Sequence, residues 1–163
     1  MSRALEAEHA ERAALREGDR VLSFSELADQ VRRTARILID EGMEPGDRVA
    51  VYLPDCFESA VSILGAIYAG GVAMPVSELV SSNDLRNRLR SGGASFCIVD
   101  ASLRENVDEI RDDLESLKEV ISVGDGEASA SDVDLSLLIA SAEPLEDAAA
   151  VAEDAPSLLL FSA

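Results

Sequence analysis

Between Ser25 and Gly42, apolar and polar residues follow one another with the period of an amphipathic helix. The apolar positions are Leu27, Val31, Ala35, Leu38 and Ile39. Charged side chains occupy the positions between them, which predicts one face in a core and one face in solvent. Ser25 is the candidate N-cap and Gly42 the candidate C-cap. This segment is therefore predicted to be a helix between two turns.

Val49–Leu53 is an uninterrupted run of apolar and β-branched residues, which is typical of a strand buried on both faces. Pro54 ends the run, and Asp55 is positioned to cap the helix predicted over Cys56–Ala69. That helix is apolar on most sides, so we expect it to lie buried against a sheet.

The alternation of helix and strand continues along the chain. A short strand over Val72–Val76 precedes a helix that begins at Ser82-Asn83-Asp84 and stops at Gly92-Gly93. The remaining predicted elements are a strand over Ser95–Val99, an acidic helix over Arg104–Leu117 and a strand over Glu119–Val123. This order predicts an α/β fold, in which helices flank a mostly parallel sheet with right-handed crossovers.

Length and composition predict one domain made of four segments. With 163 residues, 47% of them hydrophobic, the chain can bury one sizeable core. Residues 1–20 are predicted to form a leading helix, and residues 21–123 carry the βα repeats. Residues 124–154 are rich in Ala, Asp, Glu, Ser and Gly and are interpreted as a polar connection with a short helix near Val133–Ile139. Residues 155–163 are predicted to form a further strand.

The charge balance limits the expected partners. Net charge is −18, from 32 acidic and 14 basic residues, and Lys118 is the only lysine. Such a surface repels phosphate backbones and anionic headgroups, so we expect no binding to nucleic acid or membrane surfaces. Acid excess with arginine in place of lysine is typical of halophilic proteins, whose self-repulsion salt screens. An ordinary acidic protein is the alternative.

Cysteine and histidine are too few and too scattered to indicate a metal site. Cys56 and Cys97 fall on a predicted helix start and a predicted strand, and the single histidine, His9, is far away in sequence. We interpret both cysteines as small buried apolar residues rather than zinc ligands or disulfide partners. No signal peptide is expected, and the longest apolar stretch, Ala60–Met74, is too short to span a bilayer. We therefore expect a cytoplasmic protein.

Three short motifs, taken in order and spacing, carry a family resemblance. They are Ser-Phe-Ser-Glu-Leu at Ser23–Leu27, Gly-Met-Glu-Pro-Gly-Asp-Arg-Val-Ala at Gly42–Ala50 and Ala-Gly-Gly-Val-Ala-Met-Pro-Val at Ala69–Val76. With them, the chain resembles the N-terminal portion of the AMP-forming acyl-CoA synthetases, a family of adenylate-forming enzymes. The resemblance implies the first part of that family's large N-terminal domain. Ser77-Glu78-Leu79 departs from the family's usual step after the proline, which leaves the acid used undetermined.

Leu158–Ala163, Leu-Leu-Leu-Phe-Ser-Ala, resembles the strand that leads into the phosphate-binding loop of that family. On this resemblance Ser162 is the candidate nucleotide-binding residue. The family uses ATP and Mg²⁺ to convert a carboxylic acid to an acyl-adenylate, from which the thiol of CoA displaces AMP. Its catalytic groups follow the phosphate-loop strand, so no catalytic or metal-binding residue is assigned here. The chain alone is expected to be inactive and to bind ATP, Mg²⁺ and CoA weakly at best.

Two features that suggest phosphate chemistry have simpler structural interpretations. Lys118 lies near the end of an acidic segment, where pairing with Glu115 or Glu119, or with the helix C-terminus, is favoured over catalysis. Gly70-Gly71 follows a helix and precedes a strand, whereas phosphate loops follow a strand and open a helix. We therefore interpret the glycine pair as a helix stop.

Aromatic and acidic residues near the predicted strands are interpreted in the same way. Tyr52 and Tyr68 could stack on adenine, but both sit in apolar runs and are expected to pack in the core. Asp55 lies at the end of a strand, where open α/β sheets place ligands, and is expected to act as a helix cap.

Two other classes of protein fit parts of the pattern. The first is a stand-alone, non-catalytic binding or regulatory module, such as one half of a split enzyme that docks a complementary C-terminal half. Such a module would expose apolar surface around Leu158–Phe161. The second is a receiver-like signalling domain, which is disfavoured because Val49–Leu53 ends in Pro54-Asp55 and Lys118 precedes a strand instead of following one.

Overall fold

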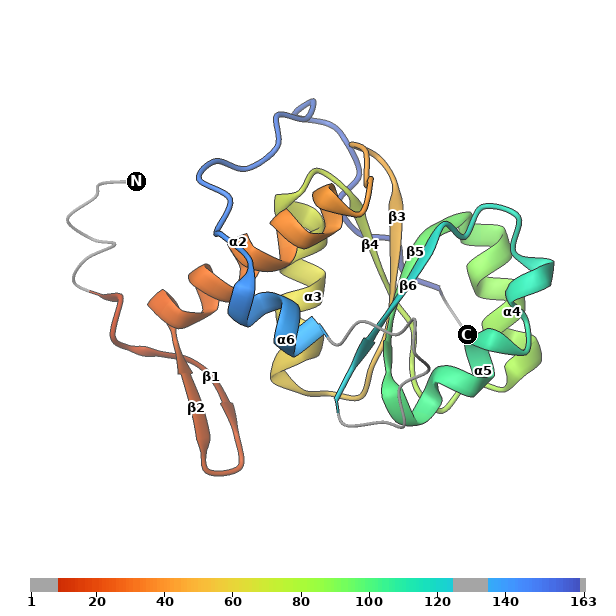
Figure 1. Ribbon diagram of the computed structural model, residues 1–163, viewed down its shortest axis with the longest axis horizontal. Coiled ribbons are helices and arrows are strands. Elements are labelled where there is room, and N and C mark those ends of the chain that lie inside the picture. Colours follow the sequence, from red (N-terminus) through yellow and green to blue (C-terminus); the bar gives the residue numbers. More distant parts are fainter. Residues whose placement is uncertain (1–8, 125–134, 162–163) are drawn as a thin grey trace.

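The computed structural model describes residues 9–124 and 135–161, which form a four-stranded sheet with helices on both faces (Figure 1). The strand order is β4-β3-β5-β6, with β3 over Arg48–Tyr52, β4 over Val72–Pro75, β5 over Ala94–Asp100 and β6 over Glu119–Val123. Every neighbouring pair in this sheet is parallel. The predicted α/β class is therefore confirmed.

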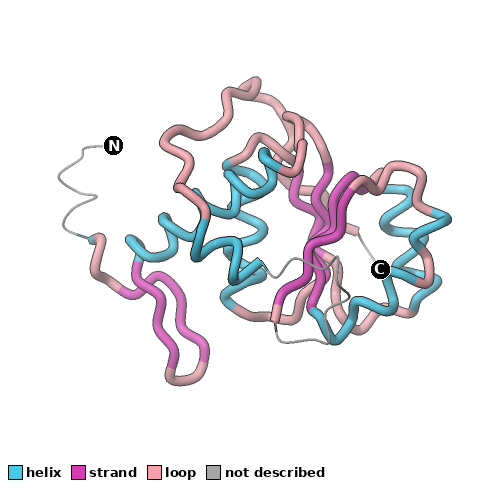
Figure 2. Tube along the Cα trace, in the orientation of Figure 1, coloured by secondary structure: helices cyan, strands magenta, loops and turns pink. Residues whose placement is uncertain are grey.

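Helices cover the sheet in two layers, and Figure 2 shows the strands as one layer between them. The α2–α3 layer consists of α2 (Phe24–Asp40), α3 (Phe57–Tyr68) and α6 (Leu135–Ser141). The α4–α5 layer consists of α4 (Ser82–Gly92), α5 (Arg104–Asp108) and the 3-10 turns η1 (Ala101–Leu103) and η2 (Arg111–Asp113). Each layer buries its own cluster of apolar side chains against the sheet.

Strand β3 contributes to both clusters. Val49 and Val51 belong to the cluster under the α2–α3 layer, whereas Ala50 and Tyr52 belong to the cluster under the α4–α5 layer. The alternation arises because successive side chains of a strand point to opposite faces. All four side chains are at most 1% exposed. The prediction of a strand buried on both faces is confirmed.

Helix α2 begins with a capping box. Ser23 Oγ accepts a hydrogen bond from the Glu26 amide at 3.2 Å, and Glu26 Oε2 accepts one from the Ser23 amide at 2.8 Å. The predicted cap, Ser25, instead lies in the first turn, so that assignment is wrong. The C-cap is Glu41, one residue before the predicted Gly42, which follows it with φ of 88°.

The caps of α3 and α4 also differ from prediction by one residue. Cys56 occupies the N-cap of α3 with no side-chain cap hydrogen bond, so the assignment of Asp55 as the cap is wrong. Ser81 caps α4, and its Oγ accepts from the Asp84 amide at 3.2 Å. Gly93 ends this helix in the left-handed conformation, with φ of 61°, which confirms the predicted glycine stop.

An antiparallel hairpin precedes α2 where the sequence predicts a leading helix over residues 1–20. It consists of β1 (Ala13–Glu17) and β2 (Arg20–Ser23). The helix prediction is wrong for the hairpin, and residues 1–8 lie outside the described residues. Gly18, with φ of 56°, makes the turn. Leu15 and Leu22 pack together against the start of α3, and this burial overrides the helix propensity of the alanine-rich sequence.

Between β5 and β6 the chain forms α5 and η2 instead of the single helix predicted over Arg104–Leu117. Ser116 Oγ donates to the carbonyl of Ala94 at 2.9 Å, and the Lys118 amide donates to the carbonyl of Ser95 at 2.7 Å. These bonds hold the residues before β6 against the start of β5, so the helix must end early. The predicted strand that follows coincides with β6.

The segment after α6 crosses the α2–α3 layer, and we call residues 142–151 the strap. The Leu145 amide donates to the carbonyl of Arg32 at 3.2 Å, and the Ala149 amide donates to that of Tyr68 at 2.9 Å. Helix α6 itself overlaps the short helix predicted over Val133–Ile139, of which residues 133–134 lie outside the described residues.

Candidate functional site

The segment that leads toward the predicted phosphate loop lies along the outer edge of β4. The Ala73 amide donates to the carbonyl of Ser157 at 2.9 Å, and the Leu159 amide donates to the carbonyl of Ala73 at 2.8 Å. The resulting bridge between Ala73 and Leu158 is parallel, so the chain runs toward the carboxyl edge of the sheet. Open α/β sheets bind their ligands at that edge. The predicted strand over residues 155–163 is thus reduced, within the described residues, to this bridge.

Alternate side chains anchor this segment to the α4–α5 layer. Leu159 and Phe161 pack against the buried cluster, whereas Leu160 is 67% exposed. The guanidinium of Arg88 lies 5.7 Å from the centroid of the Phe161 ring. Gly92 leaves room for the packing, because a Cβ there would lie 3.2 Å from Phe161 Cζ. Ser162, the candidate nucleotide-binding residue, lies outside the described residues.

The tyrosines near the strands are structural. Tyr52 is fully buried, and its hydroxyl accepts a hydrogen bond from Asn106 Nδ2 at 3.2 Å. Tyr68 is half-buried, and its hydroxyl donates to the carbonyl of Glu146 at 3.2 Å. The predicted core packing is confirmed for Tyr52, while Tyr68 packs at the rim of the core and holds the strap. Asp55 lines a hollow of about 360 Å³ between the hairpin and the start of α3.

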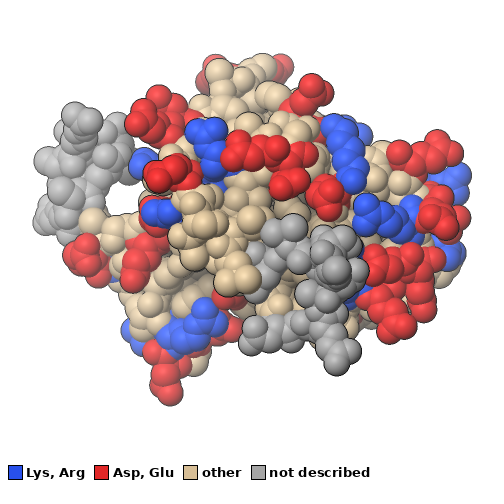
Figure 3. All heavy atoms as spheres, in the orientation of Figure 1, with Lys and Arg blue, Asp and Glu red and all other residues tan. Residues whose placement is uncertain are grey.

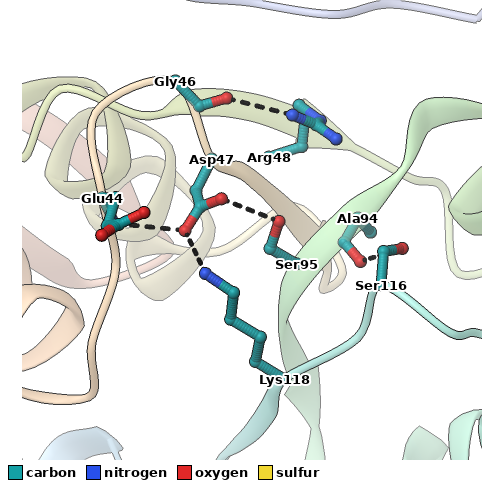
Figure 4. A network of polar contacts seen from close by, with 8 residues as sticks. All are labelled: Glu44, Gly46, Asp47, Arg48, Ala94, Ser95, Ser116 and Lys118. Atoms are coloured by element: carbon teal, nitrogen blue, oxygen red, sulfur yellow. Dashed lines mark hydrogen bonds and ion pairs between the residues drawn. The ribbon is translucent and has the colours of Figure 1, made fainter.

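A polar network joins the amino ends of three strands, at the opposite edge of the sheet (Figure 4). Asp47, just before β3, accepts hydrogen bonds from the Glu44 amide at 3.1 Å, Ser95 Oγ at 3.0 Å and Lys118 Nζ at 2.9 Å. The predicted pairing of Lys118 with a neighbouring glutamate is therefore wrong. The true partner is 71 residues away, and no local pattern indicates it.

The network keeps Asp47 ionised. Burial acts to raise the pKa of Asp47, but the hydrogen bonds from Lys118, Glu44 and Ser95, with the charge of Lys118, outweigh burial and hold that pKa below its ordinary value. The side chain of Asp47 is 15% exposed and that of Lys118 is 48% exposed. Since this edge lies opposite the ligand-binding edge of such sheets, the network is interpreted as a structural tie rather than a catalytic pair.

The glycine pair ends α3, as predicted. The Gly70 amide donates to the carbonyl of Ile67 at 3.0 Å, and the Gly71 amide donates to that of Ala66 at 2.9 Å. Gly70 has φ of 85°, which favours glycine. A Cβ on Gly71 would lie 2.9 Å from Met43 Cε, so the pair is packed against protein instead of facing a ligand.

The cysteines are free thiols. Cys97 is fully buried in β5, and burial raises its pKa to about 12. Cys56 is half-buried at the start of α3. The predicted burial is confirmed for Cys97 and is partial for Cys56. Among residues 9–124 and 135–161, no group of three or more His, Cys, Asp or Glu side chains could hold a metal ion. Within the same residues, no helix is both long and apolar enough to traverse a bilayer.

A parallel sheet between two helical layers, with a chain segment running along its edge toward the carboxyl ends of the strands, defines an open α/β domain. The family model described as "AMP-binding enzyme" matches residues 2–163. The chain therefore belongs to the AMP-binding enzyme family.

Curated relatives agree with this assignment. The acetyl-coenzyme A synthetase of Mycolicibacterium smegmatis is 33% identical over 138 residues, which cover 76% of this chain and 15% of that protein. The long-chain-fatty-acid–CoA ligase of Bacillus subtilis is 32% identical over 77 residues, 47% of this chain and 14% of that protein. The chain thus spans less than one third of the length of these relatives.

Solved structures share the fold over nearly the whole chain. The anthranilate CoA ligase AuaEII, in complex with anthranoyl-AMP, superposes with a TM-score of 0.89 at 22% identity, covering 97% of this chain and 31% of that protein. A benzoate CoA ligase from Burkholderia xenovorans superposes with a TM-score of 0.80 at 26% identity, covering 95% and 30%. The α/β fold of adenylate-forming enzymes is thereby established for this chain.

Proposed function

We propose that these residues are the N-terminal part of an AMP-forming acyl-CoA synthetase, which in full-length form activates a carboxylic acid with ATP and transfers the acyl group to CoA. The observation that supports the proposal most strongly is the family match over residues 2–163, together with relatives that are CoA ligases. The segment at residues 157–161 fits the same proposal, because it runs toward the carboxyl edge of the sheet, where open α/β sheets bind their ligands.

Three observations on the described residues support the proposal that the chain alone lacks a complete site for ATP, Mg²⁺ and CoA. Lys118, the only lysine, is held by Asp47 at the amino edge, and the described glycine pair ends a helix. No cluster of acidic residues in the described part could hold Mg²⁺. We therefore propose that these ligands and the acid bind chiefly through a longer chain, and that the 163-residue polypeptide does not form acyl-adenylate.

Carboxylate-dependent exchange of pyrophosphate into ATP tests this proposal. The purified 163-residue chain should give no exchange above the heat-denatured protein with acetate, benzoate or hexadecanoate, in the presence of Mg²⁺. Exchange that depends on both the acid and Mg²⁺ would overturn the proposed inactivity. The ligase proposal itself is tested by sequencing the transcript beyond codon 163. A Ser/Gly/Thr-rich continuation that ends in Pro-Lys supports it, and a continuation without that loop contradicts it.

A stand-alone, non-catalytic module is the second candidate, because the two helical layers enclose a core of their own on both faces of the sheet. Dependence on a complementary half would distinguish a split enzyme from such a module. For either candidate, the net charge of −18 supports a salt-rich cytoplasm as the working environment.

A further inference from the structure

The α2–α3 layer carries an apolar groove on its outer side, away from the sheet. We call it the α2–α3 groove; it has a volume of about 510 Å³. Its main apolar lining residues are Phe24, Leu27, Val31, Leu64, Ile67 and Val151. Three of them are widely exposed, with Phe24 at 51%, Leu64 at 41% and Val151 at 50%. The strap borders the groove with Ala148 and Ala149, whose side chains are too small to fill it.

Exposed apolar side chains are unevenly divided between the two layers. The large exposed apolar residues of the described helices are Phe24, Leu64 and Leu137, all of which belong to the α2–α3 layer. Helix α4 instead exposes polar and charged residues such as Asn83, Asp84 and Arg90. In the face shown in Figure 3, an uncharged area lies in the region of α6, with both acidic and basic side chains near it. In a protein of net charge −18, the α4 helix thus presents a polar surface, whereas the α2–α3 layer exposes large apolar side chains.

The pattern on α3 is that of a helix with partners on two sides. Ala66 is buried in the cluster against the sheet, and Gly65 faces Thr34 of α2. Leu64 lines the groove instead. A helix that is apolar nearly all round is buried in the interior of a larger domain. Arg32 is the one charged residue among the described lining residues, so it offers a single cationic contact at the rim.

The extent of the similar ligases indicates what covers this groove. AuaEII superposes on 97% of this chain with a TM-score of 0.89, yet the match covers only 31% of AuaEII. More than two thirds of that protein is therefore available to pack on this part. We propose that the α2–α3 groove docks an apolar segment of the remaining part of the ligase, with an acidic residue facing Arg32, so that the α2–α3 layer is internal in the full-length protein. This inference rests on the proposed function.

A chimera tests the inference. Residues 1–163 replace the matched part of AuaEII, and Leu64→Asp is introduced both in the chimera and in the isolated chain. An unpaired charge in a dry interface should lower the Tm of the chimera by about 10 °C. In the isolated chain, where Leu64 is 41% exposed, it should shift Tm by less than about 2 °C. Leu79→Asp is the matched control, because Leu79 is 86% exposed and lies outside the groove.

The other outcomes also decide the matter. If Leu64→Asp lowers Tm equally in the chimera and in the isolated chain, the docking proposal is overturned. It is also overturned if the isolated chain forms dimers and Leu64→Asp converts them to monomers. If the chimera does not unfold cooperatively, binding of anilinonaphthalene sulfonate to the isolated chain decides. Leu64→Asp should then reduce dye fluorescence at least about twofold, while Leu79→Asp should leave it unchanged. Fluorescence that is unchanged in both variants overturns the proposal.

The docking proposal and the ligase proposal fail separately. If the chimera catalyses pyrophosphate exchange and Leu64→Asp does not change the rate, the docking proposal is rejected and the ligase proposal is retained. If Leu64→Asp lowers the Tm of the chimera but the chimera catalyses no exchange, the docking proposal is retained and the ligase proposal is rejected.

Discussion

The two helical layers rest on the same sheet but are built for different surroundings. Helix α3, Phe-Glu-Ser-Ala-Val-Ser-Ile-Leu-Gly-Ala-Ile-Tyr, carries one charged residue, whereas α4, Ser-Asn-Asp-Leu-Arg-Asn-Arg-Leu-Arg-Ser-Gly, buries only Leu85 and Leu89 and is otherwise polar. The α4–α5 layer is therefore a surface layer with a thin apolar stripe. Within the α2–α3 layer, α3 has the composition of an interior helix, whereas α2 keeps a charged face. Two helices that share one layer can therefore differ in the surroundings that their sequences suit.

The largest expected effect comes from a matched pair of leucines, one in each layer. Leu89→Ala in α4 removes a fully buried side chain and should lower the free energy of unfolding by about 2–5 kcal/mol. Leu64→Ala in α3 removes one that is 41% exposed and should cost less than about 1 kcal/mol. Urea unfolding of both variants measures the difference. Similar losses for the two would contradict the assignment of Leu64 to an uncovered face.

A smaller effect is expected where α2 and α3 contact each other. A Cβ on Gly65 would lie 2.6 Å from Thr34 Cγ2 and 2.8 Å from Thr34 Cβ, so the helices must move apart. Gly65→Ala should therefore destabilise the chain by about 1–3 kcal/mol. Helix propensity alone acts in the opposite direction by about 1 kcal/mol. A variant more stable than the parent would show that the two helices can separate freely, and thermal unfolding decides the sign.

The smallest effect is expected from the Asp47 tie, which belongs to the sheet and so serves both layers. Asp47→Asn removes the charge that receives Lys118, Ser95 and the Glu44 amide and should cost about 1–2 kcal/mol. Lys118→Met should cost less than about 1 kcal/mol, because the Lys118 side chain is 48% exposed. Hydrogen exchange should accelerate alike in α3 and α4, and acceleration confined to one layer would contradict a shared role.

The same tie predicts a pH dependence of stability. Because the pKa of Asp47 is held below its ordinary value of 3.8, the folded state binds this proton more weakly than the unfolded state. The stabilisation is therefore fully present above that value and is lost as the pH falls through the lowered pKa. Unfolding free energies measured between pH 5 and pH 2, for the parent and for Asp47→Asn, should converge at the acidic end. Curves that stay parallel would rule out this contribution.

Most of the local structure could be predicted because its causes are local. The predicted strand Val49–Leu53 overlaps β3 with an offset of one residue, and Glu119–Val123 coincides with β6. Gly70 and Gly93 end helices at positions where φ is positive. The caps shifted by one or two residues, to Ser23, Cys56 and Ser81. At Ser23 and Ser81 a nearby serine offers the same chemistry, whereas Cys56 makes no side-chain cap hydrogen bond. The candidate site was less accessible to prediction. Ser162 lies outside the described residues, and the approach to it is a single bridge at Leu158 instead of a full strand.

By itself the sequence determined the α/β class, the order of the elements from α2 onward and membership in a family through three short motifs, because periodicity, glycine and local motifs act over a few residues. The tertiary structure alone decided the hairpin in place of a leading helix, the pairing of Lys118 with Asp47 and the contrast between the exposed Leu64 and the buried Leu89. Each of these depends on segments that meet only when the chain is folded, where the burial of apolar surface and the satisfaction of charged groups outweigh local propensity.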